Sequence, residues 1–342
     1  MVITVWKPNN RPNIVFSTLA LALGGYCLVL LTAYFLQISF LLEIISSFSP
    51  YWAVINFIIL FLSAVLLWRL KLSFIQARLL KLAALGMFTI FTISYSIPVL
   101  NFAFINPSIQ TNATSKSQHL KIAFFNKLFS NQNYSEISDG IAQLNPDIIA
   151  FAEFFKADAK QIKALENYPH SIVTRSPSFR NETEMAIFSK LPITSSSKDP
   201  VAGLPSALIR VRPSESGPEI NFLAVHTAAP ITQRYFTARS KQLENLVKYI
   251  NNQGLYSQNL VLAGDFNLTP WSANYRELSR KLPGLQNAAA GRGLQFTWSG
   301  FRGLANAQLD HIFYSGNVKM NNFQIAGTYG SDHHLLWANV EF

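Results

Sequence analysis

The sequence predicts three membrane-spanning helices followed by an α+β domain in which helices pack on layers of β-sheet. Two observations predict this fold class. Three long uncharged apolar runs lie within the first 105 residues, and from His119 onward short apolar runs alternate with turns and amphipathic stretches. Strands and helices mixed in this order indicate helices packed on sheet. We therefore expect a membrane region at 1–105, a linker at 106–118 and a second domain at 119–342.

The three apolar runs cover residues 12–42, 46–68 and 82–104, and none of them contains a charged residue. Crossing a bilayer takes roughly 20 apolar residues, so each run is long enough. Helices buried in a soluble protein would show a polar stripe, and these runs show none. The first run is too long for a signal peptide, and two more follow it. The sequence therefore predicts three transmembrane helices.

The charges that flank the runs predict the orientation. Lysine and arginine residues precede the first run and lie between the second and third, whereas Glu43 is the only charge between the first two. Positive charge favours the cytoplasmic side, so three crossings place residues 119–342 outside the cytoplasm, in the periplasm or the extracellular space. We expect a multi-pass protein of the cytoplasmic (inner) membrane with its N-terminus in the cytoplasm. The linker at 106–118 would reach on the order of 20 Å as a random coil.

The net charge of +10 is unevenly distributed along the chain. Residues 1–117 hold 7 bases and one acid, whereas residues 118–342 hold 21 bases and 17 acids, a balance of +4. A nucleic-acid-binding domain would need lysine and arginine along the path of a strand. Nucleic acid is therefore a less favoured partner. The single cysteine, Cys27, excludes an intrachain disulfide.

Polar side chains stand at the ends of most of the expected strands. The expected strands are 120–126, 146–154, 184–190, 206–212, 219–227, 259–267, 308–316 and 334–342, and the expected helices are 134–144, 156–168 and 233–254. Where neighbouring strands run antiparallel, the end of one lies beside the start of the next, so these side chains can collect on one rim. Asp265 and Asn267 are two residues apart and face the same way while the chain stays extended. The rim residues are Asn126, Glu153, His226 and Asp265 at strand ends, and Asp310, Asp332 and His333 at strand starts.

This set of side chains indicates a particular chemistry. Carboxylate and amide oxygens without cysteine suit a hard cation such as Mg²⁺, or Mn²⁺, more than Zn²⁺. His226 and His333 add groups that ordinarily titrate near neutral pH. No nucleophile motif and no glycine-rich phosphate loop competes with them. The residues therefore predict metal-assisted hydrolysis of a phosphate ester or anhydride.

The motifs FFN, AEF, AVHTAAP, AGDFN, LDHIF and GSDHH, in this order over residues 119–342, resemble the endonuclease/exonuclease/phosphatase superfamily, which includes the DNase I-like nucleases. The resemblance implies a two-sheet sandwich with helices outside, a four-layer α/β/β/α arrangement. Two positions depart from the pattern: Ala152 stands where many members have glutamine, and Leu335 stands where they often have proline.

The resemblance also implies a role for each rim residue. Glu153 would be the main Mg²⁺ ligand, with Asn126 and Asp332 completing the shell. His333 would polarise the attacking water, oriented by Asp310. Asp265 and Asn267 would position water or the leaving group and contact the phosphate, and His226 would contact the scissile phosphate or assist the leaving group. Weaker candidates for substrate contacts are Glu184, Arg234 and Arg239.

Three spans followed by this domain are similar to bacterial membrane members of the superfamily, some of which act on a lipid-linked pyrophosphate. We therefore expect a Mg²⁺-dependent phosphoesterase that acts on a lipid-linked pyrophosphate or a phospholipid headgroup. Two alternatives remain: an exported nuclease or general phosphodiesterase, and a non-catalytic membrane-binding module on the same fold.

Overall fold

The computed structural model describes residues 24–25, 39–69, 86, 90, 92–105, 119–174, 184–215, 217–300, 303–315 and 318–342. The chain forms two compact units, Met1–Ile97 and Pro98–Phe342, and each is considered by itself. The predicted linker at 106–118 and most of the first apolar run lie outside the described residues.

The described part of the first unit is helical. It contains α2 (Phe40–Ser47), α3 (Ser49–Arg69) and a π-helical turn at Thr92–Ser96. Glu43, expected in a loop between the first two spans, instead lies buried within α2, because the apolar residues on both sides continue the helix through it. Among the described residues no single helix is both long and apolar enough to cross a membrane. Two consecutive helical segments, residues 40–47 and 49–59, are together long and apolar enough for a span, but they are bent by 70° at the break between them.

The second unit contains two six-stranded sheets and a small hairpin. The first sheet, in spatial order, is β13 (Lys319–Ile325), β14 (Leu336–Glu341), β1 (His119–Asn126), β2 (Ile148–Phe154), β4 (Glu184–Ser189) and β3 (His170–Val173). The second is β5 (Ile193–Lys198), β6 (Ser206–Val211), β7 (Ile220–His226), β8 (Leu260–Asp265), β12 (Asp310–Tyr314) and β9 (Gln286–Asn287). The hairpin pairs β10 (Trp298–Gly300) with β11 (Ala305–Ala307).

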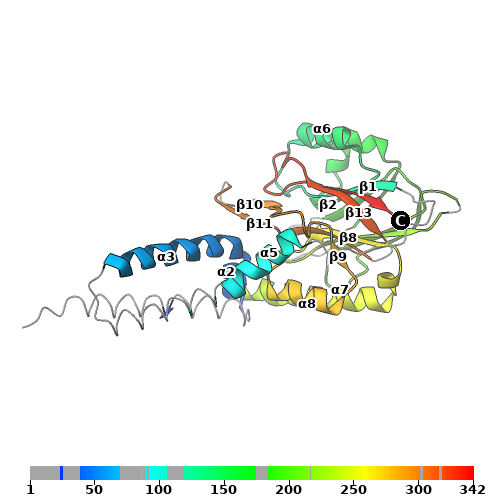
Figure 1. The fold of residues 1–342 in the computed structure, drawn as a ribbon. Coiled ribbons are helices and arrows are strands. Elements are labelled where there is room, and N and C mark those ends of the chain that lie inside the picture. The colour runs from blue at the N-terminus through cyan, green and yellow to red at the C-terminus, as the bar shows by residue number, and fades with distance from the viewer. Residues whose placement is uncertain are drawn as a thin grey trace, which may run out of the picture. The chain divides into compact units, whose positions relative to one another are not determined.

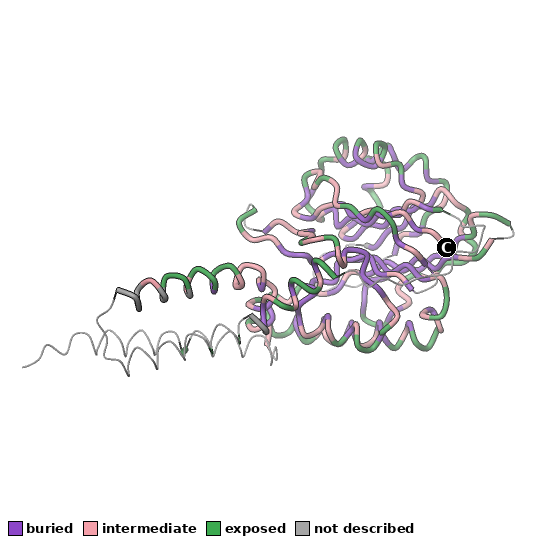
Figure 2. Tube along the Cα trace, in the orientation of Figure 1, coloured by how far each residue is buried: buried purple, intermediate pink, exposed green. Residues whose placement is uncertain are grey.

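The two sheets stack face to face with helices on both outer sides (Figure 1). Helix α6 (Tyr134–Leu144) covers the first sheet, and α7 (Gln233–Asn252) and α8 (Ala273–Lys281) cover the second. This is the four-layer arrangement that the sequence predicted. Strand β1 shows how it forms, because alternate residues of the strand face opposite sides. Ile122 packs into the core between the sheets, while Ala123 packs under α6. Figure 2 shows the strands buried and the outer faces of the helices exposed.

Helix α5 (Ile97–Phe104) brings the end of the third apolar run into the second unit. The last carbonyls of a helix have no partner within it. Here the carbonyls of Phe102 and Ala103 accept hydrogen bonds from the backbone N–H groups of Gly291 and Gly293, at 2.8 and 2.7 Å. The Phe102 ring packs against the cores on both faces of the second sheet and lies edge-on to Tyr275. The end of α5 is thus fixed to the second unit, although it precedes residues 106–118, which the sequence predicts to be the linker.

One predicted helix is wrong. Residues 156–168 form two short 3₁₀-helices, η2 (Asp158–Lys160) and η3 (Lys163–Asn167), instead of one α-helix. The extended backbone of Ile162 separates them, and the Asp158 side chain is engaged by the Phe155 N–H and the Lys127 ammonium. Short elements without a clear periodic pattern were not predicted: β3, β5, β9, β10, β11, β13, α8 and the 3₁₀-turn η4 (Leu255–Ser257).

Candidate active site

The predicted rim residues come together at one edge of the sandwich. Asn126, His226 and Asp265 are the last residues of β1, β7 and β8, and Asp310 is the first of β12. Strand pairing sets His226 beside Asp265 and Asp265 opposite Asp310. Glu153 lies near the end of β2, and His333 lies in the loop before β14. Residues from both sheets therefore share this rim.

A chain of short contacts crosses from one sheet to the other. The Asn126 side-chain amide donates to the carboxylates of Glu153 (3.3 Å) and Asp265 (3.0 Å). The Nε2 atom of His226 lies 3.9 Å from Glu153 Oε1 and 3.6 Å from Asp265 Oδ2. The Nε2 atom of His333 lies 3.7 Å from the same Asp265 oxygen. Asp265 is therefore the central residue of the cluster.

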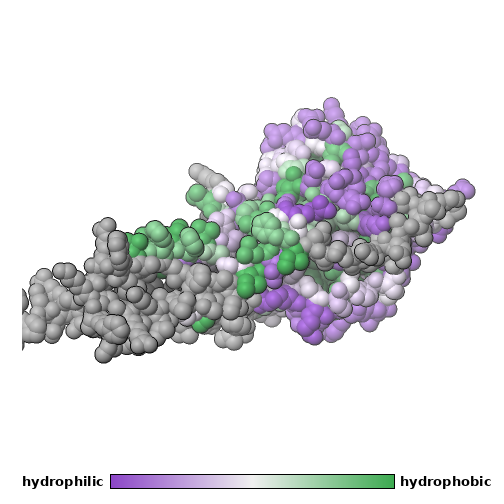
Figure 3. Space-filling view, viewed as in Figure 1, coloured by the Kyte–Doolittle hydropathy of each residue, from purple (hydrophilic) through white to green (hydrophobic). Residues whose placement is uncertain are grey.

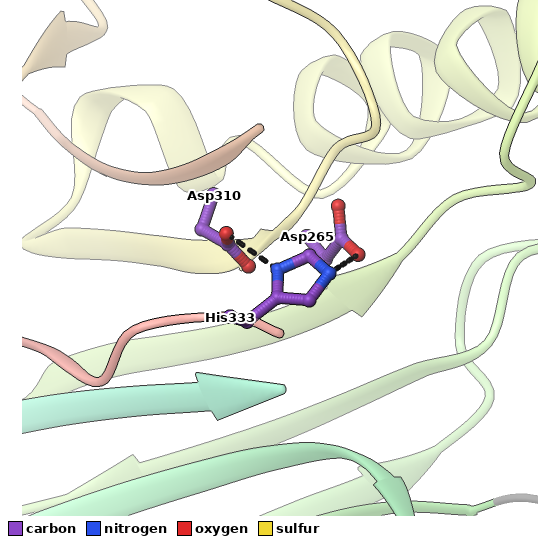
Figure 4. Close-up of side chains that lie close together, drawn as sticks. All are labelled: Asp265, Asp310 and His333. Atoms are coloured by element: carbon purple, nitrogen blue, oxygen red, sulfur yellow. Dashed lines mark hydrogen bonds and ion pairs between the residues drawn. The ribbon is translucent and has the colours of Figure 1, made fainter. Parts of the chain in front are cut away.

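His333 lies between two carboxylates, one facing each ring nitrogen (Figure 4). Its Nδ1 atom is 2.8 Å from Asp310 Oδ2, and both side chains are buried. A hydrogen bond between these atoms fixes the ring so that Nε2 points toward Asp265. The predicted pairing of His333 with Asp310 is thus present in the structure as a direct contact.

Local backbone features position the acids. Glu153 has a φ of +55°, and β2 changes register against β4 between Phe151 and Phe154. Such a backbone costs on the order of 1–3 kcal/mol and tends to occur at functional sites. Phe129 N–H donates to the carboxylate of Glu153 at 2.9 Å, which holds the side chain toward the rim.

Gly264 allows β7 and β8 to pair closely just before their polar ends. A Cβ atom at this position would come within 2.2 Å of the Val225 carbonyl oxygen, the residue it pairs with across the strands. Glycine is therefore required here because of close approach, and this explains the AGD sequence around it. The close pairing holds His226 and Asp265, one residue further along each strand, side by side.

The pKa values of Asp265 and His333 are both raised. Burial, followed by the Asp310 carboxylate, raises the pKa of Asp265 to about 6, although the neighbouring histidines lower it. Burial alone would lower the pKa of His333, but Asp310 and Asp265 outweigh that effect and raise it to about 10. The sequence suggested that His333 titrates near neutral pH. The raised pKa shows that it does not. It is a cation at pH 7, and Asp265 is the group whose ionisation lies close to neutrality.

Asn267 and Arg239 do not take the positions expected of them. The strand ends at Asp265 and Asn267 has a φ of +49°, so the two side chains do not share a face. The Asn267 amide donates to the Thr227 carbonyl at 2.9 Å, and its N–H donates to Asp265 at 2.9 Å. Arg239 is fully buried in α7 and donates to the Asn267 carbonyl. Both residues hold the loop that follows Asp265, and Arg239 has no surface with which to contact a substrate.

Three predicted residues remain: Asp332, Arg234 and Glu184. Asp332 Oδ2 accepts from the Trp298 indole N–H at 3.0 Å. Arg234 is exposed in the first turn of α7. Glu184 is the first residue of β4, opposite Phe154, and its side chain lies outside the described residues.

Sequence reasoning missed Thr297, Trp298 and Ser331. The Thr297 hydroxyl accepts from the backbone N–H groups of Leu309 (3.0 Å) and Asp310 (2.9 Å), which fixes the start of β12. The Ser331 hydroxyl donates to the Asn126 carbonyl and accepts from the His333 N–H. Thr297 and Ser331 lie in loops without periodicity, and Trp298 is the first residue of the short strand β10. The tryptophan in the polar stretch TWSG and the serine in the motif GSDHH were signals that could have pointed to this group.

The donor set fits a divalent cation. Asp265, Asp310 and His333 have side-chain atoms within 4.8 Å of one another, and the two carboxylates are the candidate ligands among them because a protonated His333 has no free lone pair. Buried oxygens of Asp310 and Asp332 (both Oδ1) have no hydrogen-bond partner in the described structure, and a cation would satisfy such oxygens. As the amide is oriented, Asn126 turns its NH₂ group toward the acids and its oxygen toward Leu128 N–H. Its predicted role as an oxygen ligand would require the opposite orientation.

The fold and the site define a hydrolase of phosphoric esters. The model of the endonuclease/exonuclease/phosphatase family matches residues 122–333, and the chain belongs to that family, whose members are metal-dependent phosphoesterases and nucleases. A search of the curated proteins found no match.

Several solved structures share the fold. The human Nocturnin catalytic domain is 18% identical, with a TM-score of 0.54 over 66% of this chain and 96% of that one. A humanized D. rerio TDP2 is 18% identical, with a TM-score of 0.54 over 65% and 98%. A mannosyl-6-phosphatase from Bacteroides thetaiotaomicron is 18% identical, with a TM-score of 0.53 over 65% and 100%. At these identities the likeness concerns the fold alone.

Proposed function

We propose that this protein is a membrane-anchored, Mg²⁺-dependent phosphoesterase that acts outside the cytoplasm on a lipid-linked pyrophosphate or a phospholipid headgroup. One observation carries the hydrolytic part of the proposal. The buried Asp265 carboxylate, whose pKa burial raises, lies 3.7 Å from Nε2 of His333, and the Asp310 carboxylate that keeps this ring charged lies 2.8 Å from its Nδ1. A general base and a cation for a phosphoryl oxygen thus lie side by side, the combination needed to deliver water to phosphorus.

In the proposed reaction, Asp265 takes a proton from water as the water oxygen bonds to phosphorus. The bond from phosphorus to the leaving oxygen breaks as the new bond forms. His333, kept charged by Asp310, donates through Nε2 to a phosphoryl oxygen as negative charge develops there. His226, one-fifth exposed at the same rim, gives a proton to the leaving oxygen.

Glu153 and Asp332 would hold the cation, joined by Asn126 once its side-chain amide is turned so that the oxygen faces the acids. A bound Mg²⁺, or Mn²⁺, supplies positive charge that polarises the phosphoryl group. The carboxylate of Glu153 faces the cluster and is partly exposed, so a ligand that enters the rim can reach it.

The anchoring part of the proposal is supported by the chain before residue 105. The uncharged runs and the basic residues that flank them favour spanning helices with the domain outside the cytoplasm. A reporter fused after Phe342 tests this in cells. Activity of a reporter that works only outside the cytoplasm is expected, and activity of a cytoplasmic reporter would reject the topology.

The catalytic part is tested with the purified full chain in detergent. Turnover is measured with Mg²⁺, and with EDTA in its place, as phosphate release from a polyprenyl pyrophosphate, headgroup release from a phospholipid, chromophore release from a soluble phosphodiester and strand cleavage of DNA. We expect Mg²⁺-dependent turnover of a lipid substrate, with a loss of at least 100-fold in Asp265→Asn and His333→Gln. Cleavage of DNA alone would reject the lipid substrate and favour a nuclease. No turnover of any phosphoester, or equal turnover in the variants, would reject the hydrolase.

A further inference from the structure

Large apolar side chains are exposed on the loops that border the active site. Among the described residues of 119–342, three such side chains lie on loops next to site residues. A fourth, Leu294, comes directly after Gly293, whose N–H donates to the end of α5. The three are Phe129 (44% exposed), Ile231 (55%) and Leu304 (84%). Single exposed apolar residues are common on protein surfaces, but here separate loops around one site carry them.

Each of the three loops is tied to a site residue. Phe129 donates its backbone N–H to Glu153. Ile231 lies in the loop that leaves β7 after His226. Leu304 lies in the β10–β11 hairpin, whose first residue, Trp298, donates its indole N–H to Asp332 and bridges to His333. Three separate loops that contact or follow site residues therefore each carry an exposed apolar side chain.

The same side of the unit carries the end of the third apolar run. Helix α5 and the β10–β11 hairpin project toward the same side (Figure 1). Figure 3 shows hydrophobic surface gathered over α5 and near the base of the hairpin, whereas the surface over α6 and α7 is hydrophilic. Because Gly291 and Gly293 bind the last carbonyls of α5, the direction of this helix relative to the hairpin is fixed. Within the second unit, the end of an apolar run that the sequence expects to span a membrane therefore lies at a fixed position on the side of the hairpin.

We propose that Phe129, Ile231 and Leu304, here called the apolar rim, seat the active site on the lipid bilayer at the boundary between headgroups and hydrocarbon. This rests on the proposed function and narrows it: the substrate is an amphiphile whose phosphate lies at the bilayer surface. An apolar rim does not match a nucleic acid, which is held mainly through phosphate contacts with lysine and arginine. The amphipathic bilayer boundary matches it, because apolar side chains enter that layer while the polar cluster stays among the headgroups.

The test uses the full chain reconstituted in phosphatidylcholine vesicles. Position 304 is labelled through Leu304→Cys in a Cys27→Ser background with a fluorophore that brominated lipids quench. A matched label at Lys248, which is exposed on α7, serves as the control. We expect quenching at position 304 and none at position 248. Equal or absent quenching at both positions would overturn the proposal, and self-association of the protein without quenching would point to a second copy as the occupant.

A second measurement separates this proposal from the proposed function. The variants Leu304→Ser and Ile231→Ser should each lower kcat/KM on a vesicle-embedded lipid substrate by about tenfold, since burying a leucine-sized side chain contributes about 1.5 kcal/mol or more. Turnover of a soluble phosphodiester should change less than twofold, and Leu304→Met should behave as the wild type. Equal losses on both substrates, or no loss on either, would overturn the apolar rim while leaving the hydrolase intact. Absence of all turnover would reject the proposed function, and the quenching would still test the rim.

Discussion

Replacing Asp310 with asparagine tests the assignment of His333 as a cation. Asp310 is fully buried, and its Oδ2 atom lies 2.8 Å from Nδ1 of His333. The variant keeps the shape of the side chain and removes its charge. An asparagine amide can also donate to Nδ1, which would leave His333 neutral with its proton on Nε2. The histidine would then stay in place but lose its charge at a lower pH than in the wild type.

The size of the effect follows from the pKa of His333. It stands at about 10 against an ordinary 6.5, and Asp310 is the largest of the influences that raise it. The difference corresponds to about 5 kcal/mol of preference for the charged ring. If Asp310 supplies about half of that preference, the pKa falls by roughly 2 units in the variant. Loss of one charged donor to a developing oxyanion costs roughly 10²- to 10³-fold in kcat.

The assay is a pH–rate profile on a soluble phosphodiester with saturating Mg²⁺. In the wild type, activity should rise as Asp265 ionises near pH 6 and fall as His333 loses its proton near pH 10. In Asp310→Asn the alkaline limb should move to lower pH by at least one unit, so activity at pH 9 should fall roughly tenfold relative to the wild type.

An unmoved alkaline limb would refute the reasoning, even if activity fell. That result would mean that His333 does not act as a titrating cation and that Asp310 only supports the fold. The thermal midpoint of the variant must be measured beside the wild type, because Asp310 is buried. His333→Gln provides the matched control, since a variant without the imidazole should show no alkaline limb of this origin.

Three further predictions concern stability and positioning. Asp158→Asn should destabilise the protein by about 3–5 kcal/mol in chemical unfolding, because it leaves the buried Lys127 ammonium, 3.1 Å from Asp158, without its counter-charge; a loss under 1 kcal/mol would contradict this. Burial lowers the pKa of His311 to about 4, so its contribution is fully present above pH 6.5 and is lost as the pH falls through 4. The unfolding free energy should drop by about 3 kcal/mol over that range, and His311→Gln should abolish that part of the drop. Thr297→Val should lower kcat, since two buried N–H groups lose their acceptor, and Thr297→Ser should restore it; equal activities would argue against a positioning role.

Much of the second unit could be predicted from the sequence, because its strands are buried on both faces and read as nearly continuous apolar runs. Strand β8 is the clearest case, with every residue from Leu260 to Asp265 buried. The missed elements are short or partly exposed. In β5, for example, the serines give no clear alternation of apolar and polar residues. The expected helix at 156–168 has helical composition, but the tertiary contacts of Asp158 override it.

The composition of the site could be predicted, but its electrostatics could not. Strand-end positions were sufficient to place Asp265, Asp310 and His226 together, because the rule concerns where strands end. The charge state of His333 depends on two carboxylates that approach it from distant parts of the chain, and spacing alone cannot reveal that. The turn at Asn267 was missed because a single residue with a left-handed backbone conformation is enough to end a strand, and the apolar pattern before it gives no sign of this.

The order of strands in the first sheet has a consequence for synthesis. Strand β1 pairs with β14, which follows it by more than 200 residues, and His333 lies just ahead of β14. A nascent chain on the ribosome therefore carries β1 with one edge unpaired until residues 336–341 have been made. The candidate active site cannot form before His333 emerges, so a product that terminates ahead of this residue should be inactive.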